Sequence, residues 1–255
     1  MLDWTSRLLE VEWLALDAVR VHFERPDAFS FMPGQTISLL LPTDHASSPP
    51  LRHIFSLAGA PHEPALSIAT RVREHSAFKQ KLIGLKEGAT LHFTGPFGYF
   101  SPPRGDARPI VLIAGGIGIA PCFSIAKHLA HTHDPRDCLL LYSCRDPESA
   151  ALLTELEDCA SRNPQMRLHV TMTSATVTAS AWRGLRGRFG QNLLGVLLDG
   201  ALDADYYVAG PAAMVDSVSK ALAALGVDGA RIAHERFFAY GDVAYGSAVI
   251  HGVPR

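Results

Sequence analysis

An apolar strand that runs into a glycine-rich turn and then a helix occupies the middle of the chain, from Val111 to Pro121. The segment reads Val-Leu-Ile-Ala-Gly-Gly-Ile-Gly-Ile-Ala-Pro. Glycines let a backbone approach a pyrophosphate closely, and a helix N-terminus presents free N–H groups and a positive dipole. We expect the helix to begin at Pro121, where a missing N–H costs nothing. The spacing G-x-G-x-x-P differs from the standard dinucleotide motif, so a purely structural turn is the alternative.

The pattern of the chain changes near residue 104. Before that point, short strands separated by turns predict an antiparallel β-barrel, at residues 13–23, 35–41, 52–58, 66–72 and 90–95. One helix interrupts them, capped by Ser76 and expected to stop at Gly88. After that point, strands alternate with helices that start at prolines, which predicts a parallel sheet covered on both faces by helices. The expected strands are 110–114, 138–142, 168–172 and 206–208, and the expected helices begin at Pro121, Pro147 and Pro211. We expect two domains, residues 1–103 and 104–255.

Composition excludes several classes of protein. The 23 Lys and Arg nearly balance 25 Asp and Glu, which argues against a nucleic-acid binder. The longest apolar run, 110–120, is shorter than the ~20 residues of a membrane span, and the first residues lack the features of a signal peptide, so a cytoplasmic protein is expected. The four cysteines show no Cys-x-x-Cys spacing. Any redox centre should therefore be a bound organic cofactor.

A second strand–turn–helix segment, Tyr206 to Met214, lies near the end of the predicted parallel sheet. Because the carboxyl ends of parallel strands meet along one edge, its Gly210-Pro211 turn should lie near the first glycine turn. Ser143 and Arg145 follow another strand of this sheet. They are candidates for the adenosine end of a dinucleotide, although Arg145 also fits an ordinary surface arginine.

In the first half, the strand Arg52 to Ala58 combines a cation, an aromatic ring and a hydroxyl. Alternation along a strand places Phe55 and Ser56 on opposite sides. A flavin needs a cation for its pyrophosphate, a ring that covers the isoalloxazine and a hydrogen bond near N5. Taken alone, the segment is equally an ordinary amphipathic strand.

Six elements in this order resemble the ferredoxin–NADP reductase family over almost the whole chain: Pro33-Gly34-Gln35, Arg52 to Ser56, Ser76, Gly95-Pro96-Phe97-Gly98, Gly116 to Pro121 and Gly210 to Met214. The resemblance implies a β-barrel domain that binds FAD, followed by an α/β domain that binds NAD(P)H. Hydride would pass from nicotinamide C4 to flavin N5, and electrons would then move onward. The cofactor-binding residues that it implies are Arg52, His53, Ile54, Phe55, Ser56, Thr70, Val72, His75, Ser76, Gly95, Phe97, Gly98, Gly116, Gly118, Ile119, Pro121, Ser143, Arg145, Arg188, Gly210, Pro211, Met214, Phe238 and Tyr240.

Three positions depart from the family pattern. His53 stands where the family usually has the pyrophosphate arginine, and Arg52 lies one place earlier, so either residue is a candidate for that contact. The loop before Ser76 lacks the usual glycine. Ala209 replaces the family's cysteine beside the nicotinamide.

Ser56 and Glu235 are the candidates for a catalytic polar pair near the flavin. A solvated charge after the last strand is the other interpretation of Glu235. In the family, the chain end often lays an aromatic ring over the flavin. Phe238 or Tyr240 is the candidate here, whereas core packing of Phe237 and Phe238 is the alternative.

The expected cofactors are FAD, because the Ser76 helix would serve a phosphate that FMN lacks, and NADP, with NAD possible. Ser143, Arg145, Arg183 and Arg188 favour NADPH because a 2′-phosphate binds arginines and hydroxyls. An acidic carrier such as ferredoxin or flavodoxin is the expected acceptor, since five cations crowd one segment: Arg71, Arg73, Lys79, Lys81 and Lys86.

Each of these expectations has an alternative. The five cations also fit a solvated helix face. A reductase that uses loosely bound flavin as its substrate is the second candidate function, favoured by His53. A regulatory or electron-transfer module that binds a dinucleotide without turnover is the third, favoured by Ala209.

Overall fold

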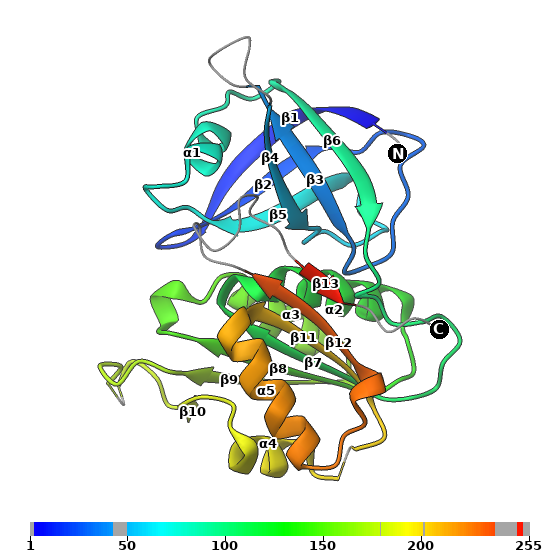
Figure 1. The fold of residues 1–255 in the computed structure, drawn as a ribbon, viewed down its shortest axis with the longest axis vertical. Helices are drawn as coiled ribbons and strands as arrows, with labels where there is room; N and C mark the ends of the chain where they lie inside the picture. The colour runs from blue at the N-terminus through cyan, green and yellow to red at the C-terminus, as the bar shows by residue number, and fades with distance from the viewer. Residues whose placement is uncertain (1–2, 43–49, 179, 201, 238–248, 252–255) are drawn as a thin grey trace.

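The structure is a computed structural model that describes residues 3–42, 50–178, 180–200, 202–237 and 249–251 of the 255-residue chain. Two layers of structure lie along the long axis, an antiparallel barrel at one end and an α/β sheet at the other (Figure 1). This arrangement confirms the predicted fold class. No helix within the described ranges combines the length and apolarity that a membrane crossing needs.

The first half forms a six-stranded antiparallel sheet in the order β4-β3-β6-β1-β2-β5. A bridge between Leu57, directly after β4, and Ile68, in the middle of β5, closes the sheet into a barrel. Alternate residues of each strand fill its core. The strands are β1 Asp3–Ala15, β2 Ala18–Glu24, β3 Thr36–Leu41, β4 Leu51–Ser56, β5 Ala65–Arg71 and β6 Thr90–Phe97.

Two details of the predicted barrel are wrong. The expected single strand over 13–23 is a hairpin that turns at Leu16 and Asp17, and its first strand begins at Asp3. Helix α1 (Ala77–Ile83) begins after Ser76, as predicted, but it ends with Gly84 as its C-cap rather than at Gly88. The Gly84 N–H makes the last helical hydrogen bond, to the carbonyl of Gln80. Phe78 and Leu82 anchor α1 in the barrel core.

The second half is a seven-stranded sheet in the order β10-β9-β8-β7-β11-β12-β13, parallel except for the last pair. Its strands are β7 Ile110–Gly115, β8 Cys138–Cys144, β9 Met166–Met172, β10 Leu185–Arg186, β11 Asp205–Pro211, β12 Ile232–Phe237 and β13 Val249–His251. Its helices are α2 Ile119–Thr132, α3 Leu153–Arg162, α4 Gln191–Leu198 and α5 Ala212–Ala224, with 3-10 turns η1 Gly116–Gly118, η2 Pro147–Ser149 and η3 Gly229–Arg231.

Helices cover both faces of this sheet, as predicted. Ile110 and Leu112 of β7 pack with residues of α2 and α3, whereas Val111 and Ile113 pack with residues of α4 and α5. Two helix starts differ from the prediction: α2 begins two residues before Pro121, and Pro147 opens η2 rather than α3. Pro121 still lies in the first turn of α2, where its missing N–H leaves no bond unmade.

Helix α2 fixes the two halves to each other. Ser124 lies on α2 with no solvent exposure, and its hydroxyl donates a 2.6 Å hydrogen bond to the Gly59 carbonyl of the barrel. Lys127, one turn later, forms an ion pair with Glu63. Phe100, in the connecting segment, packs into the α2 core. The proposed domain boundary near residue 104 falls in that connection, between β6 and β7.

Candidate dinucleotide site between the two domains

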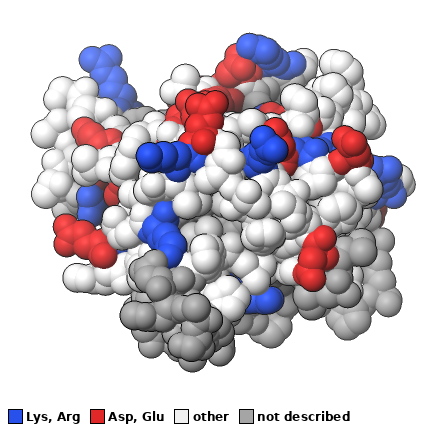
Figure 2. Space-filling view, turned by 90° about the horizontal axis from the view of Figure 1, so that it is seen from above, with Lys and Arg blue, Asp and Glu red and all other residues white. Residues whose placement is uncertain are grey.

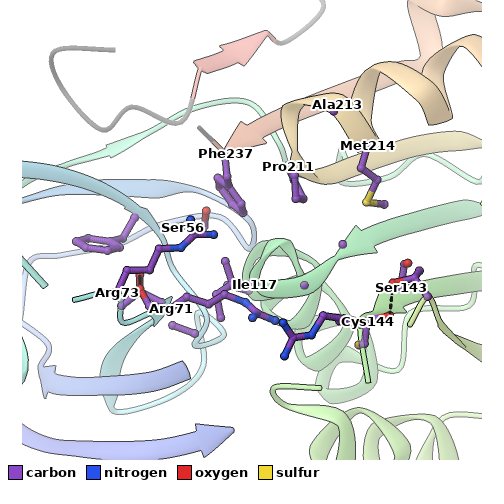
Figure 3. A pocket seen from close by; sticks show the side chains of 18 of the residues that line it. Ser56, Arg71, Arg73, Ile117, Ser143, Cys144, Pro211, Ala213, Met214 and Phe237 are labelled. Atoms are coloured by element: carbon purple, nitrogen blue, oxygen red, sulfur yellow. Dashed lines mark hydrogen bonds between the residues drawn. The ribbon is translucent and has the colours of Figure 1, made fainter. Parts of the chain in front are cut away.

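A cavity of about 580 Å³ lies between the barrel and the carboxyl edge of the parallel sheet. Figure 3 shows Arg71 and Arg73 entering from the barrel side, with Pro211 and Met214 on the opposite wall. Phe237, at the end of β12, points into the space between the two walls. The cavity is of the size that binds organic cofactors, and it lies where ligands of open α/β sheets bind.

The glycine turn shapes this cavity partly through protein packing. A Cβ added to Gly115 would overlap the sulfur of Met214, and one added to Gly118 would overlap the Ala209 carbonyl oxygen. Gly115 and Gly116 both line the cavity, but a Cβ added to Gly116 would meet no atom closer than 3.6 Å, and its φ of +53° is a conformation that favours glycine. Gly116 is therefore the glycine of this turn that can admit a ligand backbone or phosphate, while the other two let α2 approach β11 and α5.

Twelve of the candidate site residues line this one cavity: His53, Ile54, Phe55, Ser56, Thr70, Ser76, Gly116, Ser143, Arg145, Arg188, Pro211 and Met214. The structure thus brings together residues from β4, β5, α1, the glycine turn, β8 and the β11–α5 junction. Their individual roles stay predictions.

The other described candidates do not line the cavity: Arg52, Val72, His75, Gly95, Phe97, Gly98, Gly118, Ile119, Pro121, Gly210 and Glu235. Arg52 and His75 are exposed. Gly95 and Gly98 accept hydrogen bonds through their carbonyls from Trp4 and Gln35, so they organise the end of the barrel. Phe238 and Tyr240 lie outside the described residues.

Ser56 and Glu235 form a buried pair beneath the cavity wall. The Ser56 hydroxyl donates a hydrogen bond to Glu235 Oε1, and the Glu235 side chain has no solvent exposure. Oε2 has no hydrogen-bond partner among the described residues. Burial raises the pKa of Glu235 to about 8, against the opposing effect of the Ser56 bond. The interpretation of Glu235 as a solvated charge is wrong; at neutral pH it is a buried carboxylic acid.

The barrel side of the cavity is electropositive. Arg71 makes a 2.8 Å ion pair with Asp17 and donates to the Ser149 carbonyl, whereas Arg73 and Lys79 line the wall beside it. Three of the five cations expected on an outer docking face therefore border the cavity.

The expected adenosine end lies beyond the ends of β8 and β9. Ser143, Arg145, Thr173 and Arg188 line it. Arg145 is exposed and pairs with Asp146 at 2.8 Å. Arg183 does not line the cavity.

Sequence reasoning missed several lining residues: Ala69, Arg71, Arg73, Lys79, Thr173, Phe189, Ala213, Ser217 and Phe237. The signal for Phe237 was present, because it ends a strand beside β11 and pairs in register with Pro211. The sequence analysis considered Phe237 only as a residue of the core.

The cysteines offer no redox centre within the described structure. Cys122, Cys138 and Cys144 are buried, and burial raises the pKa of Cys138 and of Cys144 to about 12. Among described residues, no group of three or more His, Cys, Asp or Glu side chains is placed to hold a metal ion. A long cavity with cations along one wall, a glycine turn and a buried acid fits dinucleotide ligands.

Comparisons with known proteins agree with this architecture. Residues 112–220 match the model of the oxidoreductase NAD-binding domain. The chain is 28% identical to the glycine betaine monooxygenase reductase subunit of Pseudomonas aeruginosa, covering 84% of the chain and 58% of that protein. It is 29% identical to ferredoxin–NADP reductase B of Sorangium cellulosum, covering 71% of the chain and 73% of that protein. The crystal structure of the Amycolatopsis cytochrome P450 reductase superposes with a TM-score of 0.79 at 27% identity, covering 92% of the chain and 69% of that structure.

The barrel, the α/β sheet and the cavity between them form a two-part fold whose second part matches the oxidoreductase NAD-binding domain. Over most of its length, the chain is similar to reductases that include a protein named as a ferredoxin–NADP reductase. It spans only about three-fifths of the first relatives it matches, 58% of the glycine betaine monooxygenase reductase subunit.

Proposed function

We propose that the protein is a flavoenzyme that takes hydride from NAD(P)H into FAD and passes electrons to a separate acceptor. One observation carries the proposal: a single cavity runs from the barrel wall at Ser56 to the glycine turn at Gly116, so two cofactors held by different domains would meet there. We assign FAD binding to residues 1–103 and NAD(P)H binding to residues 104–255.

In this proposal, the chain contributes position and electrostatics. The flavin supplies the hydride acceptor and can release electrons singly or in pairs. Phe55, Ser56 and Thr70 form the barrel wall against which it would be held. Gly116, Pro211 and Met214 form the wall for the nicotinamide dinucleotide. Fixing the two reactants together removes an entropic cost that is worth several kcal/mol of barrier.

The Ser56–Glu235 pair has a separate role in this mechanism. Glu235 holds a proton at neutral pH, and Ser56 links that carboxyl group to the cavity wall. Both side chains are buried. We assign to this pair two roles: it orients the flavin ring, and it holds a proton beside the reacting rings.

An acidic carrier protein, such as a ferredoxin or flavodoxin, is the acceptor that we propose. Three of the five cations that favoured an acidic carrier border the cavity, so they give less support to an outer docking surface. Lys86 is an exposed cation of the same segment. The face at the barrel end carries both signs of charge side by side (Figure 2). The relatives named as reductase subunits of a glycine betaine monooxygenase and of a stachydrine N-demethylase favour a protein acceptor over free flavin. A cytoplasmic location stays a prediction.

The proposal is tested by the visible spectrum of the purified protein, followed by anaerobic titration with NADH and NADPH. We expect a bound flavin that bleaches with about one equivalent of nicotinamide, and mass spectrometry should identify it as FAD. A protein that purifies without flavin and binds none on addition would overturn the proposal. Release of FMN alone would overturn the choice of FAD.

A further inference from the structure

Strand β4, where the family usually carries its pyrophosphate arginine, supplies no cation to the cavity. Arg52 is exposed and lies outside the cavity lining. His53 lines it but packs as an aromatic ring, 4.6 Å from Phe55 and 5.4 Å from Phe78 between centroids. Burial and the nearby Lys79 lower the pKa of His53 to about 4, so its ring is neutral at physiological pH. Neither residue of β4 is placed to neutralise a diphosphate.

Two other cations border the same wall. Lys79 comes from α1, and Arg73 from the loop that leads into it. Within the described part of the chain, neither makes an ion pair, whereas neighbouring Arg71 is paired with Asp17. Helix α1 holds Lys79 in place, because Ser76 caps the helix through the Lys79 N–H and Phe78 anchors it in the core. Lys79 is thus held beside the cavity, the exposed Arg73 lies next to it, and no carboxylate is among the described residues that line the cavity.

Such an arrangement is unfavourable without a ligand. An ammonium group removed from water without a counter-charge is destabilised, and a second cation nearby adds repulsion. The pKa of Lys79 reflects both effects, since burial and then Arg73 lower it to about 8. A fold that holds two unpaired cations at a cavity wall is organised to receive an anion there. A phosphate or diphosphate gives both cations charge-assisted hydrogen bonds.

We propose that Lys79 and Arg73 neutralise the diphosphate of the flavin dinucleotide, in place of an arginine on β4. This assignment rests on the proposed function, because it takes the cavity to hold FAD. In this assignment, Lys79 of α1 binds the diphosphate of FAD, and the uncharged ring of His53 forms part of the cavity wall. The assignment also makes flavin retention depend on pH, because Lys79 must be protonated to bind the diphosphate.

The first test compares how tightly purified variants hold FAD. Dissociation constants are obtained by diluting the flavin-loaded protein and following the fluorescence of released FAD. Lys79→Met should weaken FAD binding about tenfold or more, since a charge-assisted contact is lost. Lys79→Arg should stay near the wild type. Arg52→Met, a matched removal of a cation from β4, should change the constant less than about twofold.

The second test uses pH and needs no destabilising variant. In the wild type, the dissociation constant should rise between pH 7.5 and 9.5, approaching about tenfold per pH unit above the Lys79 pKa. The rise should disappear in Lys79→Arg, because arginine stays charged over this range. Circular dichroism at each pH checks that the variants are folded.

Several results would overturn the assignment. Tight FAD binding by folded Lys79→Met would do so, as would a flat wild-type pH profile or an equal loss in Arg52→Met. These outcomes differ from failure of the proposed function, in which the wild type would hold no FAD at any pH.

Discussion

Ser56 and Glu235 are hydrogen-bonded across the domain junction, although 179 residues separate them in the sequence. Ser56 ends strand β4 of the barrel, and Glu235 lies in β12, in register with Ala209 of β11. The bond therefore couples the proposed flavin wall to the strand pair beside the proposed nicotinamide wall. Burial keeps a proton on Glu235, so the junction contains a neutral acid rather than a charge.

Glu235→Gln should change how stability depends on pH. The folded-state pKa of Glu235 is raised from 4.5 to about 8, so the folded protein keeps a proton that the unfolded chain loses in this range. The contribution of Glu235 to the free energy of unfolding of the wild type is largest below about pH 4.5. It falls by up to about 4 kcal/mol as the pH rises towards 8. Glutamine does not titrate, so Glu235→Gln should not show this fall in stability with pH. Urea unfolding at pH 5, 6.5 and 8 measures the free energy of unfolding. Glu74→Gln, at an exposed position, is the control. If the difference in free energy of unfolding between the wild type and Glu235→Gln stays constant with pH, the expectation is contradicted.

Ser56→Ala should slow reduction of the bound flavin by NAD(P)H by about tenfold to a thousandfold, within the range for loss of a positioned polar group. The variant should also raise the pKa of Glu235 further, because the Ser56 bond favours the charged form. Anaerobic stopped-flow absorbance measures the rate. Ser38→Ala removes another buried hydroxyl, one with no partner in the described structure, and should leave the rate unchanged. Equal rates for the two variants would remove Ser56 from the mechanism.

Gly118→Ala should destabilise the fold by about 1–3 kcal/mol, the usual cost of overpacking. The added methyl group would overlap the Ala209 carbonyl oxygen, so α2 and β11 would have to separate. Gly190→Ala is the control, because no atom lies within 4 Å of its added Cβ and its φ is −93°. Thermal unfolding compares them. A similar melting temperature for both variants would show that the close approach of α2 to β11 carries no strain.

Arg188→Ala should narrow the preference for NADPH, because Arg188 lines the far end of the cavity. We expect kcat/KM for NADPH to fall about tenfold, with little change for NADH, since one charged contact to the 2′-phosphate is lost. Arg183→Ala, outside the cavity, should leave both values unchanged. A wild type that uses NADH as well as NADPH would refute the preference itself.

Reduction of an acidic carrier such as ferredoxin should slow as ionic strength rises, because salt screens the attraction between opposite charges. Lys86→Glu reverses an exposed charge and should lower the apparent association rate about severalfold at low salt. Stopped-flow reduction of the carrier measures this rate. Rates that do not change with salt would place the docking surface elsewhere.

The helical and strand order of the second half follows directly from local patterns. Strands buried on both faces are continuous apolar runs, as in β7, and the turns that follow them carry glycine or proline. The hairpin at Leu16 and Asp17 was missed because an exposed leucine stands at the turn and apolar residues flank it. Asp17 is the one polar residue between the two strands, and no glycine or proline marks the turn.

The sequence by itself determined the resemblance to the ferredoxin–NADP reductase family, the two sheets, the glycine turn and the choice of Ser56 and Glu235 as a candidate pair, because these depend on residue type and spacing. The tertiary structure decided their environment. It made Glu235 a buried acid, made His53 neutral and placed Lys79 at the cavity wall without an ion-pair partner among the described residues. It also filled the space above Gly115 and Gly118 with Met214 and Ala209. Desolvation and close packing arise from residues that are distant along the chain, so no local pattern encodes them.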